Sequence, residues 1–177
     1  MTARALAPVA VAVLTSTALA SNAAPSSTTA PCAGGHVART ASYVLALSLG
    51  PPEAMYTLAQ VKAERPRSGE VMLGGAMSPM HMAMGRAYHL ELHVCSRSSG
   101  AVVTGAAPTI WVAEAKGMAK RLPVAEMEGV RSGRSDYHYG NNVAFAPGSR
   151  VTITVVLRGE RATFHLVVPK AAHTMKP

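Results

Sequence analysis

Residues 88–95 alternate between apolar and polar side chains, and this period-two pattern constrains the fold more than any other feature. The run reads Tyr-His-Leu-Glu-Leu-His-Val-Cys. Successive side chains of a β-strand point to opposite faces, so Leu90 and Leu92 would share one face while the histidines and Glu91 share the other. The run therefore predicts a half-buried strand whose polar face carries groups that bind transition metals.

Short runs of this kind recur from Thr40 onward, separated by Gly, Pro and Ser, and helical periodicity is nearly absent. The pair Gly159-Glu160 between the last two runs is a two-residue hairpin signal. Many short strands in one chain predict an all-β fold, namely an immunoglobulin-like antiparallel β-sandwich. We expect strands over 43–49, 55–63, 70–73, 86–95, 108–112, 120–127, 142–145, 150–158 and 162–168.

The N-terminus has the composition of an export signal. Arg4 precedes an apolar stretch over 5–19, and Ala18-Leu19-Ala20 fits the small-residue cleavage rule. The stretch is too short and too rich in Ala for a membrane span. We therefore expect an exported protein of the periplasm, cell envelope or extracellular space. Its parts would be a signal peptide (1–20), a flexible linker (21–38), one β-sandwich domain (39–170) and a C-terminal tail (171–177).

The chain contains two cysteines, Cys32 and Cys95. In an exported protein such a pair predicts one disulfide, which would attach the linker to the end of the histidine-rich strand. A lipid-anchored Cys32 is the alternative. Pro31 directly before it, and its distance from the apolar stretch, argue against that alternative.

The charge and the missing motifs exclude several function classes. The formal net charge is +8, but the basic residues are spread over loop-like segments without interleaved aromatic residues, so nucleic acid is not an expected partner. A solvated surface or attraction to an acidic envelope explains the charge. The sequence has no Gly-rich phosphate loop, nucleophile elbow, HExxH or paired CxxC, and no spacing marks a catalytic triad. We therefore expect a protein that is not an enzyme.

The polar face of the histidine-rich strand offers two pairs of ligands. Neighbours on one strand face lie about 6.6–7 Å apart at Cα, so His89 with Glu91, or Glu91 with His93, can share an ion. His89 and His93, about 13 Å apart, cannot do so comfortably. The alternative is a polar strand that simply faces solvent.

A second candidate lies in residues 136–142, which read Asp-Tyr-His-Tyr-Gly-Asn-Asn. Gly and Asn here predict a tight turn feeding a strand, with His138 positioned between two tyrosine rings. The alternative is a packed aromatic corner in which the histidine bonds a backbone carbonyl.

A third candidate is a segment rich in methionine. Pro79 in its middle argues against a helix, and an irregular loop of thioethers would suit Cu(I). The alternatives are methionines that fill gaps in the core, or a loop that tolerates oxidation. This possible second metal site consists of Met77, Met80, His81, Met82 and Met84.

Two motifs resemble those of the periplasmic iron-transport accessory proteins, which are immunoglobulin-like β-sandwiches that bind copper beside iron permeases. One is His89-Leu90-Glu91, and the other is the His-Tyr-Gly-Asn-Asn run over 138–142. The family also has a thioether ligand on a strand between these motifs, and Met127 is the best match to it. The resemblance covers residues 43–168 loosely.

The resemblance implies His89 and His138 as imidazole ligands, Met127 as the soft ligand and Glu91 as an adjacent carboxylate. It implies copper as the bound ion, with iron also possible, a membrane metal (iron) transporter as partner, and a possible homodimer that completes the site. The predicted function is therefore metal binding in support of iron uptake. The alternatives are a copper chaperone or resistance protein that uses the methionine-rich loop, and a cell-surface interaction module that binds no metal.

Overall fold

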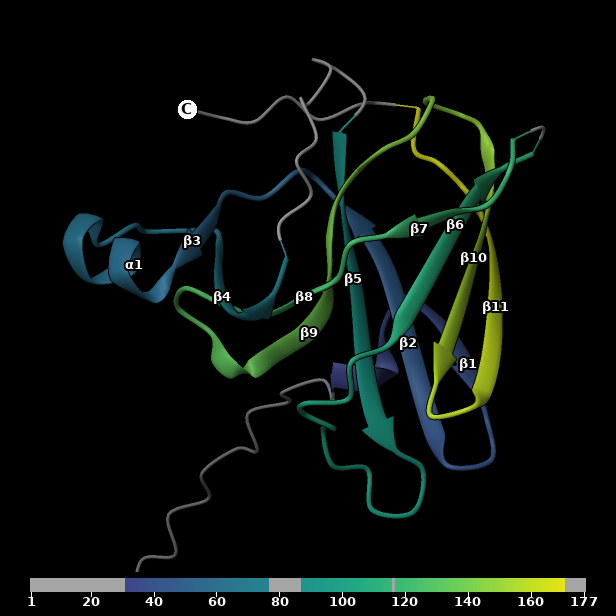
Figure 1. Cartoon of the computed structure of the whole chain (residues 1–177), viewed down its shortest axis with the longest axis horizontal. Helices are drawn as coiled ribbons and strands as arrows, with labels where there is room; N and C mark the ends of the chain where they lie inside the picture. Colours follow the sequence, from purple (N-terminus) through teal and green to yellow (C-terminus); the bar gives the residue numbers. More distant parts are fainter. Residues whose placement is uncertain (1–30, 77–86, 116, 171–177) are drawn as a thin grey trace, which may run out of the picture.

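The computed structural model describes residues 31–76, 87–115 and 117–170, which form two β-sheets and little helix (Figure 1). Neighbouring strands are antiparallel except for the pair β3 and β4. The expected all-β sandwich is thereby confirmed. The elements are η1 Pro31–Ala33, β1 His36–Arg39, β2 Tyr43–Gly50, β3 Met55–Thr57, α1 Leu58–Glu64, β4 Glu70–Gly75, β5 Ala87–Ser96, β6 Thr109–Glu114, β7 Lys120–Leu122, β8 Ala125–Gly129, β9 Gly133–Ala144, β10 Arg150–Leu157 and β11 Glu160–Val167.

The larger sheet has the strand order β1-β2-β5-β9-β8-β4-β3, and the smaller one has the order β11-β10-β6-β7. Their inner faces supply one hydrophobic core. On β5 the core side chains include Leu90 and Leu92, and on the opposite sheet they include Ile153 and Phe164. The alternation in the sequence thus places Leu90 and Leu92 in the core as predicted, and it turns His89, Glu91 and His93 to the outer face of the larger sheet.

The stretch 55–63 is only partly the predicted strand. β3 ends at Thr57, and α1 begins at Leu58 because Thr57 and Gln60 form a capping box. In it the Thr57 side chain accepts from the Gln60 backbone N–H while the Gln60 side chain accepts from the Thr57 N–H. These reciprocal bonds satisfy free N–H groups at the helix start, which the strand-like sequence pattern did not reveal.

The prediction of a tight turn over 136–142 is wrong, because these residues lie inside β9, the longest strand. Gly140 serves a close approach of two backbones there instead of a turn. A Cβ added to it would lie 1.8 Å from the carbonyl oxygen of Leu90 on β5. The predicted strand over 120–127 is likewise two strands, β7 and β8, on either side of Pro123.

The last two strands form the expected hairpin, but its loop is one residue earlier than predicted. Leu157 pairs with Glu160, so the two loop residues are Arg158 and Gly159. Both have positive φ, 49° and 84°, as a two-residue turn of the I′ type requires.

The N-terminal part of the fold is attached by the predicted disulfide, which joins Cys32 to Cys95 on β5. β1 pairs with β2 over residues 36–39, so the first strand begins inside the segment expected to be linker. The expected signal peptide, residues 21–30 of the expected linker, the methionine-rich segment 77–84 and the expected tail lie outside the described residues. Among the described residues, no helix is long and apolar enough to cross a membrane.

Candidate metal centre

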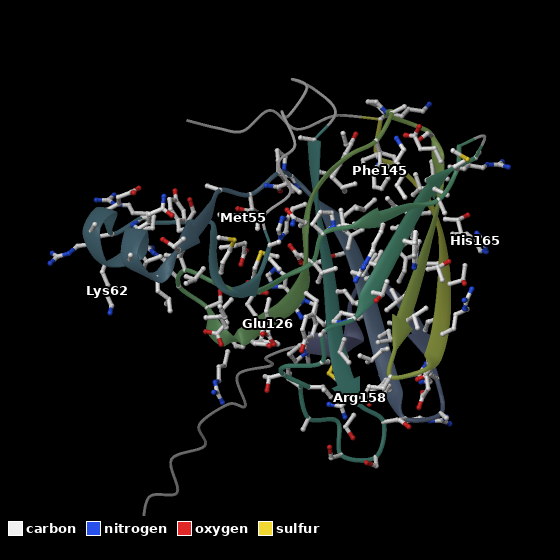
Figure 2. All side chains as sticks on the ribbon, in the orientation of Figure 1. Met55, Lys62, Glu126, Phe145, Arg158 and His165 are labelled. Atoms are coloured by element: carbon white, nitrogen blue, oxygen red, sulfur yellow. A yellow bond between two sulfur atoms is a disulfide. The ribbon has the colours of Figure 1, made fainter. Side chains whose placement is uncertain are left out.

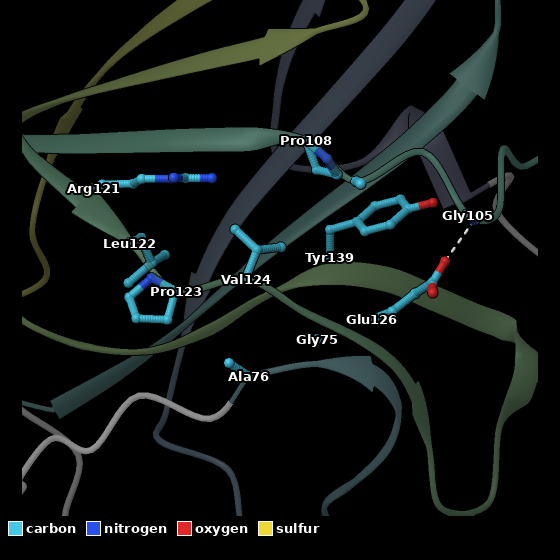
Figure 3. A pocket seen from close by; sticks show the side chains of 11 residues that line it. Gly75, Ala76, Gly105, Pro108, Arg121, Leu122, Pro123, Val124, Glu126 and Tyr139 are labelled. Carbon is cyan, nitrogen blue, oxygen red and sulfur yellow. Dashed lines mark hydrogen bonds between the residues drawn. The ribbon is translucent and has the colours of Figure 1, made fainter.

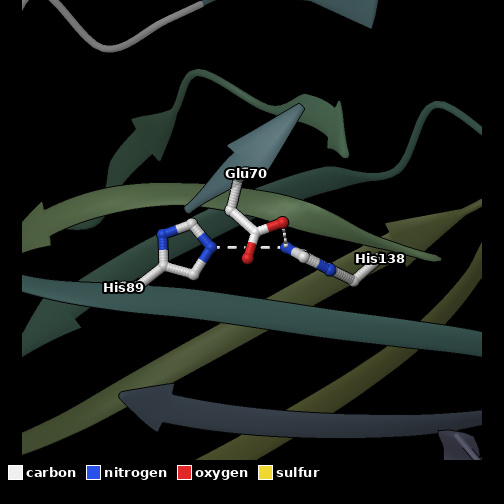
Figure 4. Close-up of side chains that lie close together, drawn as sticks. All are labelled: Glu70, His89 and His138. Atoms are coloured by element: carbon white, nitrogen blue, oxygen red, sulfur yellow. Dashed lines mark hydrogen bonds and ion pairs between the residues drawn. The ribbon is translucent and has the colours of Figure 1, made fainter. Parts of the chain in front are cut away.

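Three strands of the larger sheet each contribute one potential metal ligand to a single buried cluster. Glu70 comes from β4, His89 from β5 and His138 from β9, and their ligand atoms all lie within 4.8 Å of one another (Figure 4). Both imidazoles are fully buried, and the Glu70 residue is 6% exposed. We refer to Glu70, His89 and His138 as the metal cluster.

The cluster exists because the larger sheet curls strongly. β4 lies three strands away from β5 in the sheet order, which in a flat sheet would separate them by about 14 Å. The segment between β2 and β3 also crosses this outer face, since Glu53 N–H donates to Asn142 Oδ1 on β9. Curling and crossover together remove from solvent two histidines that an open sheet would expose.

The hydrogen bonds of Asn142 determine the tautomer of His89. Asn142 Oδ1 accepts from the Glu53 N–H at 3.1 Å while its Nδ2 donates to the Glu53 carbonyl at 2.7 Å, which fixes the orientation of the amide. The same Oδ1 lies 3.0 Å from His89 Nδ1, so that nitrogen must carry the proton. His89 Nε2 consequently presents a lone pair to the cluster.

His138 is held in the same tautomer by a backbone group. Its Nδ1 lies 2.7 Å from the carbonyl oxygen of Asp136, which can only accept, so Nδ1 donates and Nε2 is left with a lone pair. The two Nε2 atoms are 3.3 Å apart. Two nitrogens bound to one ion at 2.0–2.1 Å with tetrahedral geometry lie about 3.4 Å apart. The imidazole spacing therefore fits a shared ion.

Glu70 supplies a carboxylate oxygen that has no other partner. Its Oε2 is the buried side-chain polar atom that, within the described residues, makes no hydrogen bond, and it lies 3.8 Å from His138 Nε2. Burial, followed by the charges of three nearby carboxylates, raises the pKa of Glu70 to about 8 from the usual 4.5. A bound cation would offset both the burial and this repulsion.

The imidazoles are kept neutral by their surroundings. Burial is the main cause that lowers the pKa of His89 to about 4 from 6.5, and it lowers the pKa of His138 as well. Neutral imidazole is the form that binds metal, and a hydrogen bond from the other ring nitrogen is the usual support of a metal-binding histidine. Both rings therefore have the protonation state and support of ligands.

Acidic side chains gather around the metal cluster although the chain is basic overall. The repulsion that raises the pKa of Glu70 comes from Asp136, Glu91 and Glu53. Four of the nine acidic residues of a chain with a net charge of +8 thus interact at one place. This concentration of negative charge favours a cation.

The structure brings together two of the four ligands expected from the sequence, His89 and His138. Met127 is fully buried on β8 directly opposite His138 and faces the same side of the sheet. Glu91 lies outside the cluster, because it accepts from Ser48 Oγ at 3.0 Å and faces His93 Nε2 at 4.0 Å. The carboxylate beside the imidazoles is Glu70 instead, a residue for which no sequence motif gave a signal.

His93 lies beside the cluster rather than in it. Its ring is 5.6 Å from that of His138, centroid to centroid, and its Nδ1 donates to the carbonyl oxygen of Tyr137 at 2.9 Å. It is therefore a neighbour of the cluster, which agrees with the lesser role that the motif His89-Leu90-Glu91 left to it.

A separate cleft of about 620 Å³ lies near β7 and β8 and is lined by Arg121, Glu126 and Tyr139 among others (Figure 3). Its carboxylate is already bonded, since Glu126 accepts from Tyr137 and from the Gly105 N–H. Among its described lining residues, the cleft therefore has no buried side-chain polar atom without a hydrogen bond, in contrast to Glu70 in the metal cluster.

Comparisons of the chain with protein-family models, with curated proteins and with solved structures give no match. The resemblance to iron-transport accessory proteins therefore rests on the two short motifs, Met127 and the loose likeness over residues 43–168. The geometry of the metal cluster carries the functional assignment.

Proposed function

We propose that this chain is an exported protein that binds copper or iron at the metal cluster and supports metal uptake across the membrane. One observation carries the metal-binding part. Two imidazole lone pairs and one unpartnered carboxylate oxygen converge in a site closed to solvent. With Glu70 ionised, these are three acceptors without a donor, which is unfavourable in an apolar environment, and a metal ion satisfies all of them at once.

A proton is the simplest competitor for this place. It could bridge the two Nε2 atoms, or stay on Glu70, whose pKa is raised to about 8. Neither arrangement satisfies all three groups, because Glu70 Oε2 lies 3.8 Å from His138 Nε2, too far for a hydrogen bond. Formation of an imidazolium is also opposed by burial, which lowers the pKa of both rings. A metal ion accounts for all three groups.

The ligand types support copper first. Imidazole suits Cu(I) and Cu(II), and the methionine facing His138 adds a soft ligand, while Glu70 allows harder ions such as iron. Delivery of the ion to a membrane transporter is the step implied by the two sequence motifs. Export is supported by the disulfide, which is typical of oxidising compartments.

A titration of the full chain with Cu(II), in which binding is measured by calorimetry, tests the site. We expect His138→Ala to weaken binding at least about a hundredfold, because it removes one of few strong ligands. His165→Ala is the matched control, since that histidine is exposed on β11 in the other sheet. Equal affinity of the wild type and His138→Ala would refute the assignment.

A pair of carboxylate variants distinguishes Glu70 from Glu91. We expect Glu70→Gln to weaken Cu(II) binding by about tenfold to a hundredfold and Glu91→Gln to change it far less. The reverse order would show that Glu91 is the ligand. Metal analysis of protein purified without an affinity tag gives the broader result, because a chain with no bound or bindable metal would be an interaction module.

The thioether ligand has its own test. Met127→Leu keeps the volume of this buried side chain, so the fold should be preserved while the soft ligand is lost. We expect weaker Cu(I) binding, measured by competition with a Cu(I)-specific chelator, and nearly unchanged Zn(II) binding. Unchanged Cu(I) affinity would leave Met127 as a core residue only.

A further inference from the structure

The outer face of the smaller sheet carries basic side chains without acidic ones. On β10 the buried residues alternate with outward ones, and the pairing places Arg150 opposite Val167 and Thr152 opposite His165. On the neighbouring strands, Arg161 pairs with the outward Val156 and Arg121 pairs with Trp111. We refer to this surface as the β10 face, defined by Trp111, Arg121, Arg150, Arg161, His165 and Val167.

The acidic residues of these strands do not share that face. Glu114 pairs with the core residue Val151, and Glu160 pairs with the core residue Leu157, so both stand at strand ends on the inward side of the alternation. Glu114 accepts from the Ala146 N–H, and Glu160 accepts from the Ser42 N–H. Within the described residues of the four strands, the outward side chains are therefore basic, neutral polar or apolar.

The β10 face lies on the opposite side of the sandwich from the carboxylates in and around the metal cluster. Those carboxylates surround the outer face of the larger sheet, whereas His165 marks the far side of the smaller sheet (Figure 2). The carboxylates around the metal cluster and the arginines of the β10 face thus lie on opposite faces of the sandwich. An extended negative surface would orient the molecule with the β10 face toward it.

The apolar groups on the β10 face indicate what kind of negative surface fits. Trp111 is 39% exposed and Val167 is 65% exposed. An indole beside arginines is the combination that sits at the headgroup level of a bilayer, with the ring partly buried and the cations near phosphates. Single-stranded nucleic acid would instead need several aromatic rings on which its bases can stack. Among the described residues of this face, Trp111 is the one Phe, Tyr or Trp side chain.

We propose that the β10 face docks the protein on an anionic lipid surface, through Arg121, Arg150 and Arg161 with Trp111 at the headgroup level. This inference does not depend on the proposed metal function. Docking in this orientation holds the outer face of the larger sheet, with the carboxylates around the metal cluster, away from the lipid, which is also negatively charged.

Vesicle binding tests the proposal, and Trp111 is a built-in probe because the chain has one tryptophan. The full chain is mixed with vesicles of phosphatidylcholine containing phosphatidylglycerol, and with pure phosphatidylcholine vesicles. We expect binding to the anionic vesicles, a blue shift of the tryptophan emission, and loss of both as salt is raised. Binding without a change in the emission would place the contact on another face and overturn the proposal, as would a lack of binding.

Charge reversal supplies the matched comparison. The triple variant R121E/R150E/R161E should bind anionic vesicles about a hundredfold more weakly or worse, since each basic residue near such a surface contributes separately. The control K62E/R65E/R67E changes the net charge equally on and beside α1, at the opposite end of the view in Figure 2. It should bind nearly as the wild type does.

Equal losses in the two triple variants would reduce the effect to net charge and overturn the proposal. Binding through the N-terminal segment, which all variants share, would appear as no loss in either. The milder R121Q/R150Q/R161Q variant, checked by cooperative thermal unfolding, covers the case in which the reversals prevent folding. Tighter and equally face-dependent binding of a single-stranded oligonucleotide would replace the lipid by nucleic acid.

Discussion

At the scale of single residues, the metal cluster depends on two groups that never touch the ion site. The Asn142 amide oxygen and the Asp136 carbonyl each accept a hydrogen bond from one Nδ1–H, which leaves both Nε2 lone pairs directed toward Glu70. Such supporting hydrogen bonds fix the ring orientation and the tautomer of metal-binding histidines. The run over 136–142 therefore supplies a candidate ligand, His138, together with the groups that support both imidazoles.

The raised pKa of Glu70 predicts how metal affinity depends on pH. Below a pKa of about 8 the carboxyl is protonated, so binding must displace that proton. The affinity for Zn(II) should rise about tenfold per pH unit from about pH 6 to 8 and then level off. His89, with a pKa lowered to about 4, does not compete in this range. Calorimetry in buffers of different ionisation enthalpy counts the released proton.

Glu70→Gln is the control, because it removes the titrating group while keeping the side-chain shape. We expect its affinity to be lower at pH 8 and flat down to about pH 6. A persistent tenfold slope in this variant would assign the proton to another group.

The same shift has a readout that needs no metal. Unfolded Glu70 loses its proton near pH 4.5, whereas folded Glu70 keeps it to about 8, so this group lowers the free energy of unfolding as pH rises through that window. Between pH 4.5 and 6.5 the lowered pKa of His89 acts in the opposite sense. The fall should therefore be clearest from pH 6.5 to 8, and Glu70→Gln should abolish it.

The sequence identified the imidazoles because each lies in a short motif with unusual chemistry. Glu70 could not be found that way, since an isolated glutamate at the start of a strand is ordinary. Its role arises from the curl of the sheet, which depends on contacts among β4, β8 and β9 far apart in the chain. Glu91 was expected because it lies two residues from His89 on the same strand. The carboxylate that lies next to the imidazoles in space is Glu70, from another strand.

At the scale of elements, the pairing of β5 with β9 positions both imidazoles. His89 lies opposite Asn142, and Glu91 lies opposite Gly140, where an added Cβ would clash with the backbone of Leu90. Strand alternation predicted β5 well. For β9 the sequence instead predicted a turn, because Gly and Asn usually mark turns. Here Gly140 permits a close approach of the two backbones, and Asn142 supports the His89 ring.

Gly140→Ala should consequently damage the site and the fold together. Its Cβ would lie 1.8 Å from the Leu90 carbonyl oxygen, and backbone cannot move aside as a flexible side chain can. We expect a loss of about 3 kcal/mol or more in the free energy of unfolding, measured by urea denaturation, with weaker metal binding.

Gly117→Ala is the matched substitution, because the nearest atom to its added Cβ is 3.6 Å away, an ordinary contact. It should change the free energy of unfolding by less than about 0.5 kcal/mol. If Gly140→Ala were equally harmless, the backbones of Gly140 and Leu90 would not lie as close together as the structure places them.

At the scale of the whole molecule, the sandwich separates its hydrophobic core from the metal cluster, which lies outside that core. The inner faces of both sheets supply the hydrophobic core, while the metal cluster occupies the outer face of the larger sheet under the crossover near Glu53. The two-sheet architecture followed from strand alternation. The crossover and the curl did not, because they are set by long-range pairing that alternation does not encode.

The disulfide is the covalent link at this scale, and its removal should test stability apart from metal binding. It closes a loop with a sequence separation of 63 that contains β1–β5, and therefore both Glu70 and His89. The double variant C32S/C95S should lose about 4 kcal/mol in the free energy of unfolding, because its unfolded chain regains that loop entropy. Wild-type protein under reducing conditions should show the same loss in urea denaturation.

Neither cysteine contributes to the metal cluster, so folded C32S/C95S should bind Zn(II) as the wild type does. A folded variant without metal binding would mean that the disulfide holds β5 in the position that the cluster needs.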